Sequence, residues 1–280
     1  MTRSILITGC SSGIGAAAAR SLKTRGWRVF ASARKAEDVE RLRADGFEAL
    51  RLDLDDSESI AQALRELLER TDGRLDALFN NGAYGQPGAV EDLSRDALRA
   101  QLETNLLGWF DLTNRVIPVM RRQGHGRIVM NSSVLGLVGL PFRGAYVASK
   151  FALEGLTDTL RLELRGSGIH VALIEPGPIT SRFRANAHAA FLRNIDRERS
   201  YFREKYAAAE RRLTKQGPAA PFTLPPEAVV DALVHALESP RPKARYYVTV
   251  PTHLFGTLRR LLPTRALDAI LRAVSRGENR

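Results

Sequence analysis

The chain has 280 residues, of which 44% are hydrophobic and 26% charged, which is the composition of a globular protein rather than a disordered one. A single cysteine, Cys10, excludes an internal disulfide and a cysteine-rich zinc site. The net charge of +11 raises the question of a nucleic-acid partner. The arginines are spread along the chain, however, and no zinc-finger, RRM or KH signature is present, so we expect no nucleic-acid partner.

The first apolar run, residues 5–7, is far shorter than the core of a secretory signal, and no stretch reaches the ~18 apolar residues that a membrane-spanning helix needs. We therefore expect a soluble, cytoplasmic protein. The five histidines lack the spacing of metal ligands, so no metal site is expected.

Short apolar runs alternate with amphipathic stretches along most of the chain. Strands are predicted at residues 5–7, 27–31, 48–52, 75–79, 127–131, 170–174 and 246–250. Helices are predicted at residues 13–25, 36–45, 57–70, 96–122 and 144–165. The alternation predicts an α/β fold, a doubly wound seven-stranded parallel sheet with helices on both faces, in a single domain over residues 1–280.

Two segments depart from this alternation. Residues 179–224 are rich in arginine, alanine and aromatic side chains and close with several prolines, which predicts a helical, substrate-binding insertion or lid. The alternative is a surface excursion with no role in binding. Residues 254–280 carry apolar residues at helical spacing, interrupted by Pro263 and interspersed with arginines. This amphipathic segment is expected to pack over the substrate pocket or a dimer partner, and peripheral membrane contact is the alternative.

A glycine-rich turn follows the first strand and opens the first helix. Its sequence runs from Thr8 to Gly15 with glycines in a Gly-x-x-x-Gly-x-Gly spacing. Glycines allow the backbone to turn tightly and approach a pyrophosphate, and the helix N-terminus supplies N–H donors. The turn therefore predicts a dinucleotide site whose candidate residues are Gly9, Ser11, Ser12, Gly13, Ile14 and Gly15.

Further motifs follow in a characteristic order. They are Asn80-Asn81-Gly82-Ala83, Asn105 in Thr104-Asn105-Leu106-Leu107-Gly108, Ser133 at the end of the fifth strand, Tyr146-x-x-x-Lys150, and Pro176-Gly177. With the glycine-rich turn, these motifs resemble the short-chain dehydrogenase/reductase family over residues 3 to about 182, and they imply its Rossmann-type fold. Residues 139–142 and 150–156 resemble the 17β-hydroxysteroid dehydrogenase branch, and residues 250–252 and 259–263 resemble its bacterial NADPH-dependent aldehyde reductases. The resemblance also implies a homodimer or tetramer, formed through helices 96–122 and 144–165.

The chemistry of the motif at residues 146–150 can be read from the side chains. Tyr146 and Lys150 are four residues apart on a helix and so face the same side. A neighbouring ammonium is expected to lower the pKa of the phenol, which could then act as an acid or base on a carbonyl or alcohol oxygen. The resemblance implies that Ser133 orients the substrate oxygen, with Ser132 as the competing serine, and that Asn105 holds a water in a proton relay.

The end of the second strand distinguishes NAD from NADP binders. It carries Arg34 and no acidic residue before Glu37, which favours the 2′-phosphate of NADP(H) over the 2′-hydroxyl of NAD. The resemblance adds that Asp53, Leu54, Asn80 and Gly82 line the adenosine side and that Lys150 holds the nicotinamide ribose. It further places Asn105 and Tyr146 at the cofactor, and Pro176, Gly177, Ile179 and Thr180 near the carboxamide.

The sequence thus predicts an NADP(H)-dependent oxidoreductase that transfers hydride to an aldehyde or ketone, or from the alcohol. Its substrate is expected to be a small hydrophobic carbonyl or alcohol compound, because the candidate pocket residues are mostly apolar. These are Tyr84, Gly85, Val134, Leu135, Leu140, Phe142 and Phe183. A steroid or retinoid dehydrogenase of the same family and a non-catalytic NADP-binding regulator are the alternatives.

Overall fold

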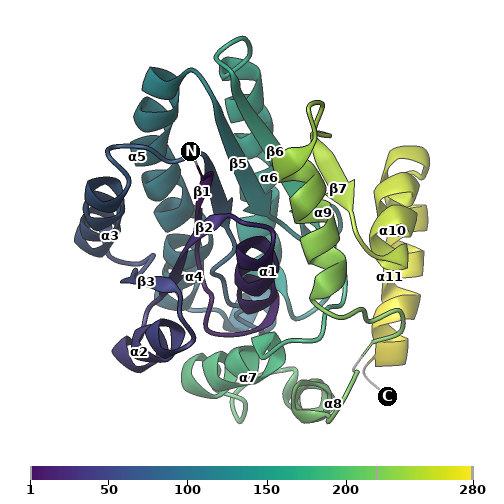
Figure 1. Ribbon diagram of the computed structural model, residues 1–280. Coiled ribbons are helices and arrows are strands. Elements are labelled where there is room, and N and C mark those ends of the chain that lie inside the picture. Colours follow the sequence, from purple (N-terminus) through teal and green to yellow (C-terminus); the bar gives the residue numbers. More distant parts are fainter. Residues whose placement is uncertain (1, 219, 279–280) are drawn as a thin grey trace.

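The computed structural model describes residues 2–218 and 220–278, which fold around one seven-stranded parallel sheet (Figure 1). The strands are β1 (Ser4–Ile7), β2 (Arg28–Ala33), β3 (Glu48–Arg51), β4 (Ala77–Asn80), β5 (Gly126–Asn131), β6 (Ile169–Glu175) and β7 (Arg245–Tyr247). Their order is β3-β2-β1-β4-β5-β6-β7, which confirms the predicted doubly wound sheet. Because the order reverses between β1 and β4, the carboxyl ends of these strands are the place where such sheets bind ligands in a crevice.

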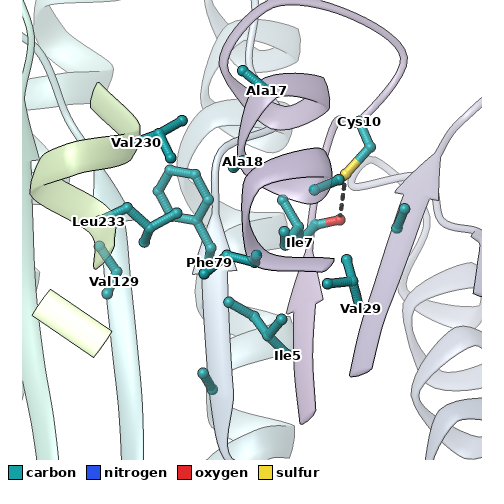
Figure 2. Packing of buried hydrophobic residues seen from close by; sticks show 14 of the residues in the cluster. Ile5, Ile7, Cys10, Ala17, Ala18, Val29, Phe79, Val129, Val230 and Leu233 are labelled. Atoms are coloured by element: carbon teal, nitrogen blue, oxygen red, sulfur yellow. Dashed lines mark hydrogen bonds between the residues drawn. The ribbon is translucent and has the colours of Figure 1, made fainter. Parts of the chain in front are cut away.

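Helices cover both faces of the sheet. One face carries α1 (Gly13–Thr24), α2 (Ala36–Ala44) and α9 (Glu227–Glu238). The other carries α3 (Ser57–Arg70), α4 (Arg95–Leu102), α5 (Gly108–Gln123) and α6 (Gly144–Glu163). Figure 2 shows the hydrophobic core between the sheet and the helices α1 and α9. Ala17 and Ala18 let α1 approach the sheet closely, and Phe79 fills the space toward Val230 and Leu233 of α9.

Two predicted elements differ from the structure. The helix predicted at 96–122 is divided into α4, a π-helical turn at Glu103–Leu107, and α5. The strand predicted at 246–250 ends at Tyr247, and Val250 already begins α10 (Val250–Leu261). Pro251 explains this ending, because proline lacks the N–H that a strand needs and its fixed φ suits the first turn of a helix.

Residues 179–224 form a helical excursion whose two ends pair with each other. The amide of Thr180 donates to the carbonyl of Leu224 at 2.9 Å. Between them lie α7 (Phe183–Asn194) and α8 (Arg203–Thr214). Tyr206 of α8 is buried, and its hydroxyl accepts a 2.8 Å hydrogen bond from the amide of Ala89 and donates to Asp92. The excursion is therefore held against the segment that follows β4.

The chain continues from α10 into α11 (Thr264–Glu278), beside β7 and α9 (Figure 1). Phe255 of α10 and Leu271 of α11 are buried against Val138, with Val134 and Leu140 packed around them. The C-terminal helices thus cover the segment that follows β5. Within residues 2–218 and 220–278, no helix combines the length and apolar character needed to cross a membrane.

Candidate active site

The glycine-rich turn forms a cradle, a stretch of closely packed backbone in which a side chain at Gly9 or Gly15 would collide with its neighbours. Gly9 has φ +73°, which glycine adopts without strain, and a Cβ on Gly15 would lie 2.3 Å from the carbonyl oxygen of Gly9. Ser12 is the N-cap of α1, yet its side chain makes no capping hydrogen bond. The first N–H groups of α1 thus lack a side-chain cap between Ser11 and Ile14, in the arrangement that binds phosphate groups.

Cys10 lies inside this turn but is not a reactive group. Its thiol donates to the carbonyl of Ile7 at 3.3 Å (Figure 2), and burial raises its pKa to about 12. A thiol in this state is a small packing residue.

The segment after β4 is tied to the turn through Asn81, a residue that the sequence analysis did not select. The Asn81 amide donates to the carbonyl of Thr8 at 2.9 Å and accepts from Asn131 at 2.9 Å. A Cβ on Gly9 would lie 2.6 Å from the Cα of Gly82, so the two segments are in contact. The side chain of Asn80 is instead fully buried and donates to Thr113 at 2.9 Å, so any contact of Asn80 with a ligand would have to come from its backbone.

The ends of β2 and β3 supply the residues expected at the adenosine side. Arg34 follows β2 and is exposed, and among the residues described it makes no hydrogen bond or ion pair. Its charge acts on Asp55, beside the half-buried Asp53 and the buried Leu54 that follow β3. Arg41 of α2, which the sequence analysis did not select, donates to the carbonyl of Ser11 at 3.0 Å. Two guanidinium groups therefore lie on the side of the crevice that α2 borders.

Lys150 is buried, and its ammonium is held from two sides. Its Nζ donates to the carbonyl of Asn131 at 2.8 Å and lies 4.2 Å from the ring centroid of Trp109. Burial lowers the pKa of Lys150 to about 7, and the charge of Glu154 acts in the opposite direction. The lysine is therefore poised to exchange a proton near neutral pH.

Tyr146 lies one turn before Lys150, whose Nζ is 5.7 Å from the centroid of its ring. Burial raises the pKa of Tyr146 to about 12, while a hydrogen bond with Ser133 opposes this rise. The lowering of this pKa that was expected from the ammonium is therefore not found, because desolvation of the phenol dominates. In this environment the phenol is kept in its neutral, proton-donating form.

Asn105 lies in the π-helical turn and is fully buried. Its side-chain amide donates to the backbone carbonyl of Tyr84 at 2.9 Å, and its side-chain oxygen accepts from the backbone N–H of Tyr84 at 3.1 Å. It also donates to the hydroxyl of Ser149 at 3.3 Å, beside Lys150. The turn thus connects the loop after β4 to the helix that carries Tyr146 and Lys150.

The loop after β6 borders the same crevice. The carbonyl of Pro176 accepts from the amide of Val134 at 2.9 Å, and a Cβ on Gly177 would lie 2.2 Å from the Thr249 hydroxyl oxygen. A Cβ on Gly13 would lie 3.0 Å from the Cβ of Ser181, so this loop also meets the glycine-rich turn. Of its other predicted residues, Ile179 packs on the core and Thr180 pairs with Leu224.

The candidate pocket residues take three different positions. The ring of Phe183 packs edge-on against Tyr146 with centroids 5.3 Å apart, and a Cβ on Gly85 would lie 2.9 Å from it. Phe142 instead packs against Tyr206 of the excursion, with centroids 5.7 Å apart. Val134 and Leu140 pack with the C-terminal helices. Phe183 and Gly85 are therefore the candidates nearest the phenol.

Comparison with known proteins identifies the family of this chain. Residues 3–190 match the family model for short chain dehydrogenases. The oxidoreductase YbbO of Escherichia coli K12 is 46% identical over 271 residues, which cover 97% of this chain and 94% of YbbO. Human 17-beta-hydroxysteroid dehydrogenase type 1 is 35% identical over 263 residues, which cover 88% of this chain and 77% of that protein.

A solved structure has the same architecture. The short chain dehydrogenase/reductase from Burkholderia phymatum in complex with NAD aligns with a TM-score of 0.77 at 26% identity, covering 97% of this chain and 95% of that one. The seven-stranded order, the glycine cradle and the grouping of Ser133, Tyr146 and Lys150 accompany this similarity. The chain belongs to the short chain dehydrogenase/reductase family of oxidoreductases.

Proposed function

We propose that the protein is an NADP(H)-dependent reductase of hydrophobic aldehydes or ketones. The observation that carries the proposal is the grouping of Ser133, Tyr146 and the buried Lys150 beside a glycine cradle at the N-terminus of α1. The cradle suits a pyrophosphate for two reasons. The first N–H groups of α1 have no side-chain cap and can donate to phosphate oxygens, and the glycines leave room for the phosphates to approach the backbone.

The cofactor preference rests on the end of β2. Arg34 is exposed there, and a guanidinium can hold a phosphate through two hydrogen bonds. Arg41 adds a second positive charge near Ser11. These residues would hold the 2′-phosphate, which NAD lacks, whereas Asp53 and Leu54 would border the adenine.

When bound, the reduced nicotinamide supplies a hydride to the carbonyl carbon. Tyr146 donates its proton to the carbonyl oxygen, which carries negative charge as the hydride arrives. Ser133 donates a hydrogen bond to the same oxygen and orients it. Lys150 returns a proton to Tyr146, and its charge eases the transfer, because a neighbouring ammonium favours the phenolate. Asn105 holds the loop at Tyr84. We further assign to Asn105 the binding of a water that would lead from Lys150 to solvent.

The protonation state of the phenol is compatible with carbonyl reduction. A pKa raised to about 12 keeps Tyr146 protonated at neutral pH, which is the form that donates a proton to a carbonyl oxygen. The apolar Phe183 beside Tyr146 favours a hydrophobic substrate.

The test is the oxidation of NADPH, followed by absorbance, with aldehydes of increasing chain length and with a panel of steroids. We expect turnover with aldehydes and a KM that falls as the chain lengthens. Selective turnover of steroids would favour the second candidate, a steroid dehydrogenase, which the similarity to the human 17-beta-hydroxysteroid enzyme supports. Bound cofactor without turnover on the whole panel would favour a non-catalytic regulator.

A further inference from the structure

A cluster of four charged side chains, two of them buried, lies on α6 and the last two strands and has no role in the chemistry above. Arg245, the first residue of β7, contacts three carboxylates. It pairs with Glu154 and Asp158 on successive turns of α6, and with Glu175 at the end of β6 at 2.7 Å. Glu175 is fully buried and Glu154 is 7% exposed. One guanidinium thus joins the helix that carries Tyr146 and Lys150 to the last two strands.

Glu154 also lies close to Ser132, which directly follows β5. Its Oε1 and the Oγ of Ser132 are buried, and neither atom has a hydrogen-bond partner within the described part of the chain. A Cβ on Gly136 would lie 2.8 Å from the Ser132 Oγ and 3.0 Å from the Glu154 Oε1, so both atoms converge on one point. Lys150 and Glu154 are four residues apart on α6, so the Glu154 carboxylate lies on the same side of the helix as the lysine of the site.

Burial raises the pKa of Glu154, and the ion pair with Arg245 opposes this rise and favours the ionised carboxylate. Burial and the neighbouring Glu154 raise the pKa of Glu175 to about 8, so Glu175 holds a proton at neutral pH. The positive charge of Arg245 then acts on Glu154 and Asp158, and Asp158 is also paired with Arg161.

The groups that contact the Lys150 ammonium are uncharged, so the negative charge that acts on Lys150 comes from Glu154. The groups that face the ammonium from α5, α6 and β5 are the indole of Trp109, the phenol of Tyr146 and the carbonyl of Asn131. These three groups are uncharged. Glu154, one turn along α6, is the charge that opposes the loss of the Lys150 proton.

We propose that Glu154 is a positioning residue that keeps Lys150 protonated during catalysis, and that Arg245 holds Glu154 ionised for this purpose. The inference rests on the proposed function, in which protonated Lys150 resupplies Tyr146. Substitution of Glu154 therefore changes the pH dependence of turnover rather than the binding of NADPH.

The test compares Glu154→Gln with the wild-type protein in NADPH-dependent carbonyl reduction between pH 6 and pH 9. The alkaline limb of kcat should move to lower pH by about one unit, the scale for loss of a nearby opposite charge, so that kcat at the alkaline end falls about tenfold. Asp158→Asn is the matched control, because it removes a carboxylate from the same guanidinium one turn farther from Lys150. Its limb should stay at the wild-type position.

Glu154→Asp serves if Glu154→Gln does not fold, because it keeps the charge for Arg245 and withdraws it by one methylene. Its limb should move in the same direction by a smaller amount. The proposal would be overturned if the alkaline limb of the kcat–pH profile had the wild-type position in the folded Glu154 variants. It would also be overturned if this limb moved by the same amount in Asp158→Asn.

A second readout requires no substrate. The chain has only six lysines, so lysine-selective 15N labelling can follow the titration of Lys150 in the NADP-bound protein. Its midpoint should fall in the Glu154 variants. If the Lys150 midpoint falls in the Glu154 variants but the wild-type protein turns over no substrate, the proposed reaction alone is refuted. If the wild-type protein turns over substrate but the Lys150 midpoint is unchanged in the variants, the role of Glu154 is refuted.

Discussion

The ammonium of Lys150 rests over the indole face of Trp109, with Nζ 4.2 Å from the ring centroid. The indole N–H donates to the carbonyl of Gly82 at 2.8 Å, so Trp109 joins α5, the loop after β4 and Lys150. Neither charge nor motif marks Trp109 in the sequence. It is nevertheless the largest fully buried side chain of the protein.

Replacing Trp109 by leucine should impair both stability and turnover. The variant loses buried contacts, the hydrogen bond to Gly82 and the cation–π contact, so the free energy of unfolding should fall by about 2–4 kcal/mol. Because Lys150 loses one of its supports, kcat should also fall. Urea unfolding and NADPH oxidation measure the two effects.

Trp27 is the matched control for this substitution. It is also buried, donates to Glu238 at 3.0 Å and carries Arg3 stacked 4.3 Å from its ring centroid, but it lies at the start of β2. Trp27→Leu should lower stability with an unchanged kcat. A normal kcat in Trp109→Leu would show that the indole contact has no part in catalysis.

Arg34→Ala should weaken NADPH binding about 10- to 100-fold, the scale of a hydrogen-bonded charge pair, and leave NADH almost unaffected. The reason is that only NADPH carries the 2′-phosphate. KM values for both cofactors measure the effect, and Arg43→Ala, an exposed arginine of α2 paired with Glu40, is the control. Equal losses for the two cofactors would mean that Arg34 does not bind the phosphate.

The protein should form a homodimer through α6 and the helical segment at residues 96–122, which comprises α4, the π-helical turn and α5. Leu107 is 51% exposed and Leu156 is 46% exposed, on two elements in contact with each other, which is the kind of apolar surface that an interface covers. Light scattering should give at least twice the chain mass of 30.9 kDa, and Leu156→Glu should reduce it. Leu192→Glu, on the exposed side of α7, should leave the mass unchanged. A wild-type particle of one chain at micromolar concentration contradicts this prediction.

Deleting residues 254–280 should destabilise the protein or raise the KM for the carbonyl substrate. The reason is that Phe255 and Leu271 cover Val138 and the neighbouring segment after Ser133. Thermal unfolding and substrate titration measure these effects. Leu261 is 73% exposed beside several arginines, so the alternative is a membrane contact. It would hold if intact protein sedimented with anionic vesicles while the truncated protein stayed soluble and fully active.

The sheet and most helices could be predicted because their patterns are local. The helix at residues 57–70 has the same bounds in the structure, where Asp56 caps it with its carboxylate. The π-helical turn at Glu103–Leu107 could not be predicted in this way. The side chain of Asn105 within it is bound by the backbone of Tyr84, a tertiary contact that leaves no trace in the apolar periodicity.

The candidate site was predictable where a motif marked it and hidden where partners are far apart in the chain. The spacing of Tyr146 and Lys150 selected them only together with Ser133 and the glycine-rich turn. Arg245 reads as an ordinary charge before a strand, because its partner Glu154 is 91 residues away. Asn81 and Asn80 are adjacent and chemically alike, and only the direction of each side chain at the end of β4 distinguishes the cradle residue from the core residue.

The central claim is that Tyr146 is the proton donor of a carbonyl reduction. The most direct measurement is kcat for NADPH-dependent reduction by Tyr146→Phe, with NADPH affinity determined in parallel by fluorescence. Removing the hydroxyl alone should lower kcat at least ~10²-fold, the scale of general acid catalysis, and leave NADPH affinity nearly unchanged. A variant that binds NADPH and turns over at close to the wild-type rate would contradict the assignment.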